Sequence, residues 1–118
     1  LIEWQIRAAA GEKLAFTQDD IKLRGHAIEC RINAEHPFRF TPSPGKVELY
    51  HPPGGRNVRV DSAVYSGYTI PPYYDSMIGK IITHARDRDK CIRTMQRAMD
   101  ELVILGVTTN QELHQRLL

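Results

Sequence analysis

The first ten residues carry apolar side chains at helical spacing. Leu1, Trp4 and Ala8 recur at intervals of three and four, and Gly11 follows where a helix would end. No Ser, Thr, Asp or Asn precedes the first apolar residue, so the expected helix lacks an N-terminal capping residue. We therefore expect residues 1–10 to form a helix truncated at its start, in a chain that is a fragment of a longer protein.

Alternation of polar and apolar residues begins at Ile21 and predicts strands. From Ile21 to Glu35 most apolar residues fall at every second position, which is typical of a half-buried strand. The turn formers Pro52-Pro53-Gly54-Gly55 interrupt this region of the chain. Further segments of strand character are 46–50, 58–61 and 77–83. In 58–61, inward-facing valines would leave Arg59 displayed on the opposite face.

Two helices are predicted after the strands. Asp87 or Asp89 can cap a helix that would end at Gly106, and its apolar residues recur at three and four: Ile92, Met95, Met99 and Leu102. Thr109 and Glu112 have the spacing of a capping box and begin a last helix. The order helix, strands, helices predicts an α+β fold, with residues 1–118 as one domain.

Composition and charge narrow the function classes. The 118 residues are 42% hydrophobic and 25% charged, close to globular averages, and the formal net charge is +2. No run of five like charges occurs, so we expect no nucleic-acid partner. No long apolar segment occurs either, so we expect no membrane partner.

Cysteines, histidines and glycines give no independent site. Cys30 and Cys91 lack CxxC spacing, and we expect both to be core residues of a protein in a reducing compartment. The five histidines match no zinc motif, so we expect no metal site in this chain. Gly54-Gly55 lacks the following Lys, Ser or Thr of a phosphate-binding loop.

Two segments leave alternatives open at this stage. Arg59 is either a solvated surface charge or a fixed clamp for bicarbonate, a carboxylate or an enolate, since its guanidinium offers planar paired donors. Pro71-Pro72-Tyr73-Tyr74 matches PPxY, the ligand of WW modules, but it leads directly into an expected core strand. A fixed turn is therefore the favoured interpretation of that segment.

Several blocks in fixed order resemble the C-terminal domain of biotin carboxylase, the ATP-grasp component of biotin-dependent carboxylases. They are RGHAIECRINAE (24–35), TPSPGKVE (41–48), VRVDS (58–62), GYTIPPYYDSMIGKII (67–82) and GVTTN (106–110). The resemblance covers essentially the whole chain. It implies an antiparallel, barrel-like sheet with flanking helices, excised from an ATP-grasp enzyme.

The resemblance also implies an activity for the parent protein. Such an enzyme uses ATP, Mg²⁺ and bicarbonate to carboxylate biotin on a carrier protein, the first half-reaction of acetyl-CoA carboxylase in fatty-acid synthesis. A pyruvate or other acyl-CoA carboxylase is an alternative parent. The family's ATP, metal and general-base residues lie upstream of Leu1, so we expect the isolated fragment to be inactive and to bind none of these cofactors. By the same resemblance we expect the parent protein to be cytoplasmic and to form a homodimer.

One family site residue maps onto this chain. Arg59 in VRVDS matches the arginine that faces bicarbonate and biotin and pairs with the general-base glutamate. Tyr73, Tyr74 and Asp75 are expected to form a rigid wall that supports Arg59, with the tyrosine rings buried. The turn from His84 to Arg88 is a candidate dimer surface. The alternatives are a dimerisation scaffold in which Arg59 is incidental, and an independent PPxY interaction module.

Overall fold

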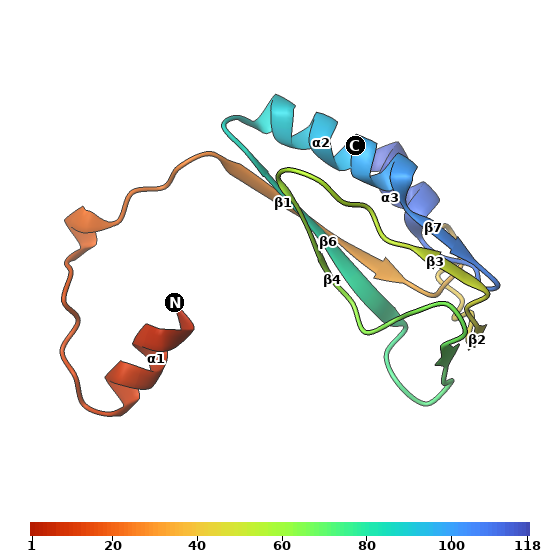
Figure 1. Cartoon of the computed structure of the whole chain (residues 1–118), viewed down its shortest axis with the longest axis horizontal. Coiled ribbons are helices and arrows are strands. Elements are labelled where there is room, and N and C mark those ends of the chain that lie inside the picture. Colours follow the sequence, from red (N-terminus) through yellow and green to blue (C-terminus); the bar gives the residue numbers. More distant parts are fainter.

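The computed structural model describes all 118 residues and shows an N-terminal segment that projects from a body of strands and helices (Figure 1). The segment contains α1 (Ile2–Ala9) and a 3-10 turn, η1 (Gln18–Asp20). No residue of α1 is buried, and Trp4 packs edge-on against Phe16 with ring centroids 5.2 Å apart. The predicted helix is confirmed. No side chain caps its first turn, as the sequence indicated.

The body is built on a three-stranded antiparallel sheet in the order β1-β6-β4. These strands are β1 (His26–Asn33), β6 (Met77–Ala85) and β4 (Val58–Asp61). All three were predicted, but the first begins at His26 rather than Ile21. Gly25 immediately before it has φ +76°, a backbone conformation outside the β region.

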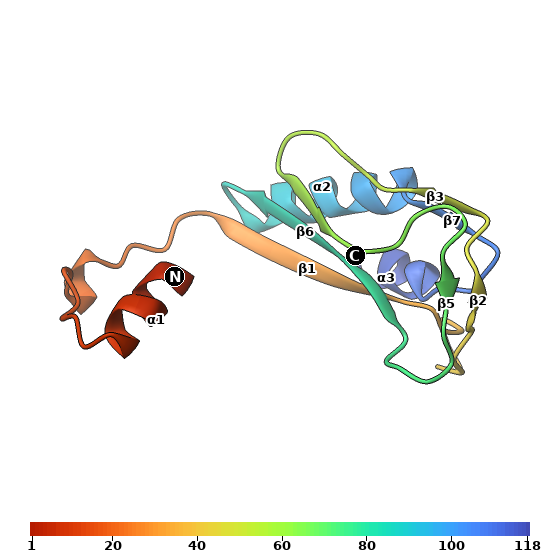
Figure 2. The ribbon, with the colours of Figure 1, turned by 60° about the horizontal axis from the view of Figure 1, so that its bottom comes forward.

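The helix α2 (Arg88–Glu101) covers one face of this sheet (Figures 1 and 2). The Asp87 side chain accepts a hydrogen bond from the Lys90 N–H at 2.8 Å, which confirms the predicted cap. The largest fully buried side chains, mostly from the sheet and α2, are Ile32, Ile81, Met95, Met99, Val47, Thr83 and Cys91. Cys30 is also buried, so the expectation that both cysteines are core residues is confirmed.

The prediction that the second helix continues to Gly106 is wrong. The helix ends at Glu101, and β7 (Val103–Leu105) pairs with β3 (Leu49–His51). The apolar spacing continues through Leu102, but β-branched residues follow it, and these suit a strand. Gly106 has φ +96° and lies against the backbone of Lys46 and Glu48, where there is no room for a side chain.

The predicted strand 46–50 is divided in two. Its first part, β2 (Gly45–Lys46), pairs with β5 (Thr69–Ile70), whereas β3 pairs with β7. Figure 2 shows the β2-β5 pair at the end of the body. Val47 lies between β2 and β3 and is completely buried. The chain therefore changes partner at a core residue, which a single run of alternating residues does not reveal.

The last helix, α3 (Gln111–Leu117), begins without the predicted capping box. Asn110 is the N-cap residue, and Glu112 pairs with Arg116 instead of folding back to residue 109. Asn110 is 6% exposed, and its side-chain oxygen accepts a hydrogen bond from the Asn33 N–H at 2.8 Å. This amide therefore ties the start of α3 to the end of β1.

The α+β class is confirmed, and the strand pairs are all antiparallel. They form one sheet of three strands and two sheets of two strands each. No ring of hydrogen-bonded strands closes, so a barrel is not confirmed. The change of partner at Val47 separates the β2-β5 pair from the β3-β7 pair.

Candidate functional site

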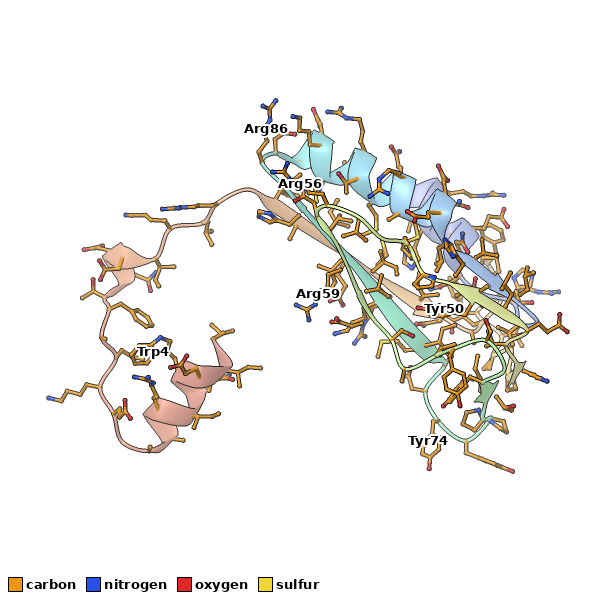
Figure 3. All side chains as sticks on the ribbon, viewed as in Figure 1. Trp4, Tyr50, Arg56, Arg59, Tyr74 and Arg86 are labelled. Atoms are coloured by element: carbon orange, nitrogen blue, oxygen red, sulfur yellow. The ribbon has the colours of Figure 1, made fainter.

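Arg59 lies on the face of the three-stranded sheet opposite α2. The neighbouring Val58 and Val60 are half-buried and pack against the core, so the two-residue period of β4 turns Arg59 outward. Its side chain is 71% exposed and points away from the sheet (Figure 3). The predicted orientation is confirmed.

Asp61 holds the guanidinium of Arg59 in a two-point contact. Nε donates to Oδ1 at 2.9 Å, and one terminal nitrogen donates to Oδ2 at 2.6 Å. Residues i and i+2 of a strand share a face, so β4 itself brings the two side chains together. The hydrogen bonds to Asp61 raise the pKa of Arg59, and the same bonds lower the pKa of Asp61.

Further charges of both signs surround this pair on the open face. Glu29 and Arg59 both lie opposite Ile82 of β6, while Arg31 and Asp61 both lie opposite Lys80. The charges therefore form two rows across the three strands. The alternating pattern placed Glu29 and Arg31 on an outer face, but only strand pairing shows that this face is the one that carries Arg59.

Two hollows border the Arg59–Asp61 pair. One, of about 310 Å³, is lined by Arg59 and by residues of β4 and β6 around Ile82 and His84. The other, of about 370 Å³, includes Asp61, Tyr74 and Asp75 in its lining. The cation and its carboxylate partner thus stand between two open depressions, where a small anion can approach the guanidinium.

The expected tyrosine wall is wrong as described. Tyr73 and Tyr74 are 87% and 81% exposed, and Figure 3 shows Tyr74 on the outer side of its loop. Asp75 accepts a hydrogen bond from the Met77 N–H at 2.7 Å and makes none to Arg59. The segment 71–76 between β5 and β6 has no regular strand pairing, so no neighbouring strand covers the rings.

His84 and Arg88 lie at the corner between β6 and α2. The ring of His84 contacts the carbonyl oxygen of Arg24 at 2.9 Å through Nε2. A terminal nitrogen of Arg88 lies 3.4 Å from Nε2 of His26. Both residues are therefore positioned by the first residues of β1 and the segment before it, on the surface of the body.

The residues of this chain form no metal site and no glycine-rich phosphate-binding loop. No three His, Cys, Asp or Glu side chains gather in a way that could hold a metal ion. Gly54 and Gly55 lie in a turn that leads into β4, not between a strand and a helix as in a phosphate-binding loop. None of the helices has the length and apolar character required to cross a lipid bilayer.

Comparisons with known proteins identify the family to which this sequence and fold correspond. Residues 29–118 match the family described as "Biotin carboxylase C-terminal domain". The chain is 56% identical over its whole length to biotin carboxylase of Haemophilus influenzae, and 56% identical over its whole length to a pyruvate carboxylase subunit from Methanothermobacter thermautotrophicus. It spans 26% and 24% of those two proteins, about a quarter of their length.

A solved structure gives the same result. The biotin carboxylase domain dimer of Hydrogenobacter thermophilus 2-oxoglutarate carboxylase, in complex with MgADP, ADP and bicarbonate, superposes with a TM-score of 0.91 at 45% identity. The match covers 98% of this chain and 26% of that one. The family match covers residues 29–118, and the sequence identity and the fold extend the agreement over nearly the whole chain. The chain belongs to the biotin carboxylase C-terminal domain family.

Proposed function

We propose that this chain is part of a biotin carboxylase, a ligase that uses ATP and bicarbonate to carboxylate biotin on a carrier protein. The relatives that match its full length include a biotin carboxylase and a pyruvate carboxylase subunit, which supports this class of reaction. Between their parent systems we favour acetyl-CoA carboxylase, and hence fatty-acid synthesis. The feature of the chain that carries the proposal is Arg59, fixed by Asp61 on the open face of the sheet.

Arg59 is proposed to bind bicarbonate and to stabilise negative charge on the ureido oxygen of biotin. A ureido nitrogen is a poor nucleophile, and its attack becomes easier when charge that develops on the oxygen meets a fixed cation. Oriented donors of this kind typically contribute a factor of about 100 to 1,000 in turnover. An arginine suits the role better than a lysine, because its donors are planar and paired.

The contact with Asp61 leaves Arg59 able to bind a substrate. A guanidinium has five N–H donors, and Asp61 occupies one on Nε and one on a terminal nitrogen. The remaining donors, including both on the other terminal nitrogen, point away from the carboxylate. Asp61 is therefore proposed to orient Arg59 without consuming its capacity to bind bicarbonate or the ureido oxygen.

ATP and Mg²⁺ are proposed to bind in the rest of the parent enzyme, within an ATP-grasp fold. The absence of a fitting set of ligands in this chain supports that division. ATP supplies the activation of bicarbonate when it is bound there. The isolated 118 residues are accordingly proposed to be inactive, because they provide only one side of the active site. Both cysteines are free thiols, which supports a reducing, cytoplasmic location.

The remaining surfaces are proposed to mediate assembly. The H. thermophilus relative is a domain dimer, which supports a homodimer of the parent. His84 and Arg88, which lie on the surface at the corner between β6 and α2, are proposed to contribute to its interface. Tyr74 and Asp75 share a hollow with Asp61, which supports an indirect role for the segment 73–75 in positioning Arg59. A barrel-like closure of the sheet is proposed to involve chain outside these residues.

The test is Arg59→Ala in the full-length enzyme, with free biotin as the acceptor. We expect biotin carboxylation to fall about 100-fold or more, while ATP affinity stays unchanged. Arg116→Ala is the matched control. Its side chain is 65% exposed and forms an ion pair of the same 2.6 Å length, with Glu112 on α3.

The two variants separate a local role from a general effect of charge. Unchanged carboxylation in Arg59→Ala would refute the assignment and favour a scaffold role for the chain. Equal losses in both variants would show that any lost surface arginine impairs the enzyme. A loss confined to Arg59→Ala, with normal ATP binding, is the outcome that supports the proposal.

A further inference from the structure

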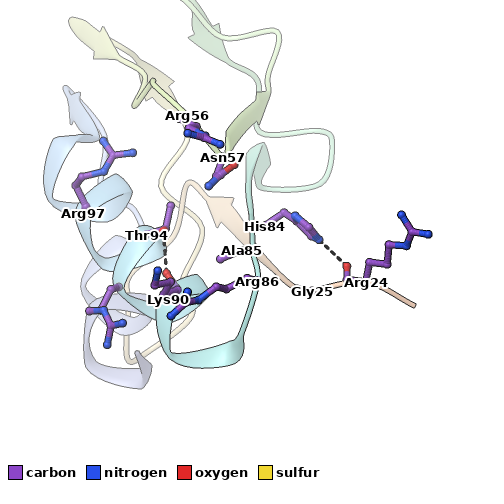
Figure 4. A pocket seen from close by; sticks show the side chains of 11 residues that line it. Arg24, Gly25, Arg56, Asn57, His84, Ala85, Arg86, Lys90, Thr94 and Arg97 are labelled. Carbon is purple, nitrogen blue, oxygen red and sulfur yellow. Dashed lines mark hydrogen bonds between the residues drawn. The ribbon is translucent and has the colours of Figure 1, made fainter. Parts of the chain in front are cut away.

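A second basic site lies apart from Arg59, between α2 and the turn that enters β4. It is an open cavity of about 840 Å³, and only one of its eleven lining residues, Ala85, is hydrophobic. No carboxylate lines it. Figure 4 shows side chains from three parts of the chain around this space. Its cationic residues are Arg24, Arg56, Arg86, Lys90, Arg93 and Arg97, and we call this cavity the basic groove.

Most of these cations have no carboxylate partner. Arg86 pairs with Asp87, and Arg97 pairs with Glu101. The side chains of the other four form no ion pair and no hydrogen bond in the structure. Four unneutralised cations around one cavity repel each other, so an anion in the groove would lower the electrostatic energy of the fold.

One wall of the groove is a continuous stripe of α2. Lys90, Arg93 and Arg97 are three, four and seven residues apart, so they lie on one face of the helix. Residues seven apart are separated by about 10 Å along the axis. A ligand that reaches the whole stripe therefore needs negative charges spread over about 10 Å, more than a single carboxylate or sulfate supplies.

The opposite wall and the floor are held in place by backbone contacts. His84 donates through Nε2 to the carbonyl oxygen of Arg24 at 2.9 Å (Figure 4). Gly25 packs so closely against the carbonyl of Ala85 that a side chain there would clash. A side-chain nitrogen of Arg97 donates to the Gly54 carbonyl at 3.2 Å, which links α2 to the turn containing Arg56.

We propose that the basic groove binds a small anion that carries several linked phosphate groups. A guanidinium group can donate two parallel hydrogen bonds to the oxygens of one phosphate. The cavity also has the size of a typical small-molecule site. Linked phosphate groups suit this cavity better than an inserted protein segment, because such a segment is anchored in a well-packed, desolvated pocket, and the open groove offers only Ala85 as an apolar lining residue. The groove is lined by no Phe, Tyr or Trp on which a base could stack, and its one imidazole, His84, is held by the Arg24 carbonyl, so phosphate groups are the recognised feature.

The test uses the full-length enzyme and inorganic tripolyphosphate as the probe, with calorimetry as the readout. The double variant Arg56→Gln/Arg93→Gln removes one exposed cation from each wall. We expect the Kd of this variant for tripolyphosphate to rise at least tenfold over that of the unmodified enzyme. The control variant Arg39→Gln/Arg116→Gln removes the same number of positive charges from surfaces outside the groove, and its Kd for tripolyphosphate should not change. Sites elsewhere in the enzyme contribute equally to both variants, so their difference reports the groove.

Further comparisons make the result decisive. Circular dichroism spectra should match between the two double variants, since all four side chains are exposed. The control should melt at the same temperature or slightly lower, because Arg116 also pairs with Glu112. Arg59→Ala should retain tripolyphosphate affinity, which separates this site from the proposed catalytic one. Equal affinities of both double variants would overturn the proposal. A deca-glutamate peptide that binds more tightly than tripolyphosphate, and depends on Arg56 and Arg93, would also overturn it in favour of an acidic protein segment.

Discussion

The substitution Gly106→Ala tests why the second helix gives way to a strand. Gly106 follows β7 at φ +96° and lies against the backbone of Lys46 and Glu48. At that point the Glu48 N–H donates to the Leu105 carbonyl at 2.8 Å and joins β3 to β7. An alanine methyl group would enter the space that this backbone occupies, so the β3-β7 pair would have to move apart.

The cost can be separated into two contributions. The first contribution is backbone strain: a non-glycine residue at this φ lowers the free energy of unfolding by about 1–2 kcal/mol. Gly67 has the same φ of +96°, so Gly67→Ala should carry the same strain as Gly106→Ala. A side chain at Gly67 would meet no atom within 4 Å. Only Gly106→Ala carries the additional cost of displaced backbone and a weakened hydrogen bond, which is about 1–2 kcal/mol.

Urea denaturation followed by circular dichroism measures the difference. With a slope of roughly 2 kcal/mol per molar urea, Gly67→Ala should lower the midpoint by about 0.5–1 M and Gly106→Ala by about 1–2 M. The comparison depends on equal slopes in the two variants. Equal midpoints would refute the reasoning, because the close backbone contact at Gly106 would then contribute nothing beyond its φ angle.

Three further predictions concern buried and capping groups. Asn110→Ala should destabilise the fold by about 2 kcal/mol, because the half-buried Asn33 N–H loses its acceptor. As a control, substitution of the exposed Gln115 on α3 by alanine should change the urea midpoint little. Similar shifts in both variants would contradict a specific role for the Asn110 side chain. Burial raises the pKa of Cys30 to about 11, so at pH 7–8 it should react with a thiol reagent only after unfolding, and rapid labelling of the native protein would refute this. Hydrogen bonds from Lys90 and Arg86 lower the pKa of Asp87, so its stabilisation is present above about pH 4 and is lost as the pH falls further. Asp87→Asn should therefore show a shallower loss of stability below about pH 4 than the native chain; parallel curves would count against it.

The sequence predicted those strands and helices in which the spacing of apolar residues matches the face that is buried in the structure. The alternation in β1 placed Cys30 and Ile32 inside, and the apolar spacing of α2 placed Met95 and Met99 inside, because each element packs one face on a single core. Arg59 was placed correctly for the same reason: its valine neighbours face the core. Period alone thus determined which side of an element is exposed.

Elements that depend on a distant partner were missed or misjudged. β5 and β7 are two and three residues long, and their strand conformation exists only because β2 and β3 pair with them. The apolar residues around Tyr73 and Tyr74 predicted burial, but no element of the body covers these rings. The capping box at 109–112 was displaced because Asn110 bonds to β1 instead. In each case a long-range contact outweighed the local preference.

The sequence by itself determined the fold class, the outward direction of Arg59 and, through its ordered blocks, the resemblance to biotin carboxylase. Tertiary structure alone decided which charges surround that arginine, since strand pairing aligns Glu29 and Lys80 with β4. It also gathered the cations of the basic groove from residues 24 to 97. The physical reason is that side-chain period is a local property of the backbone, whereas the grouping of charges depends on which segments pair and pack.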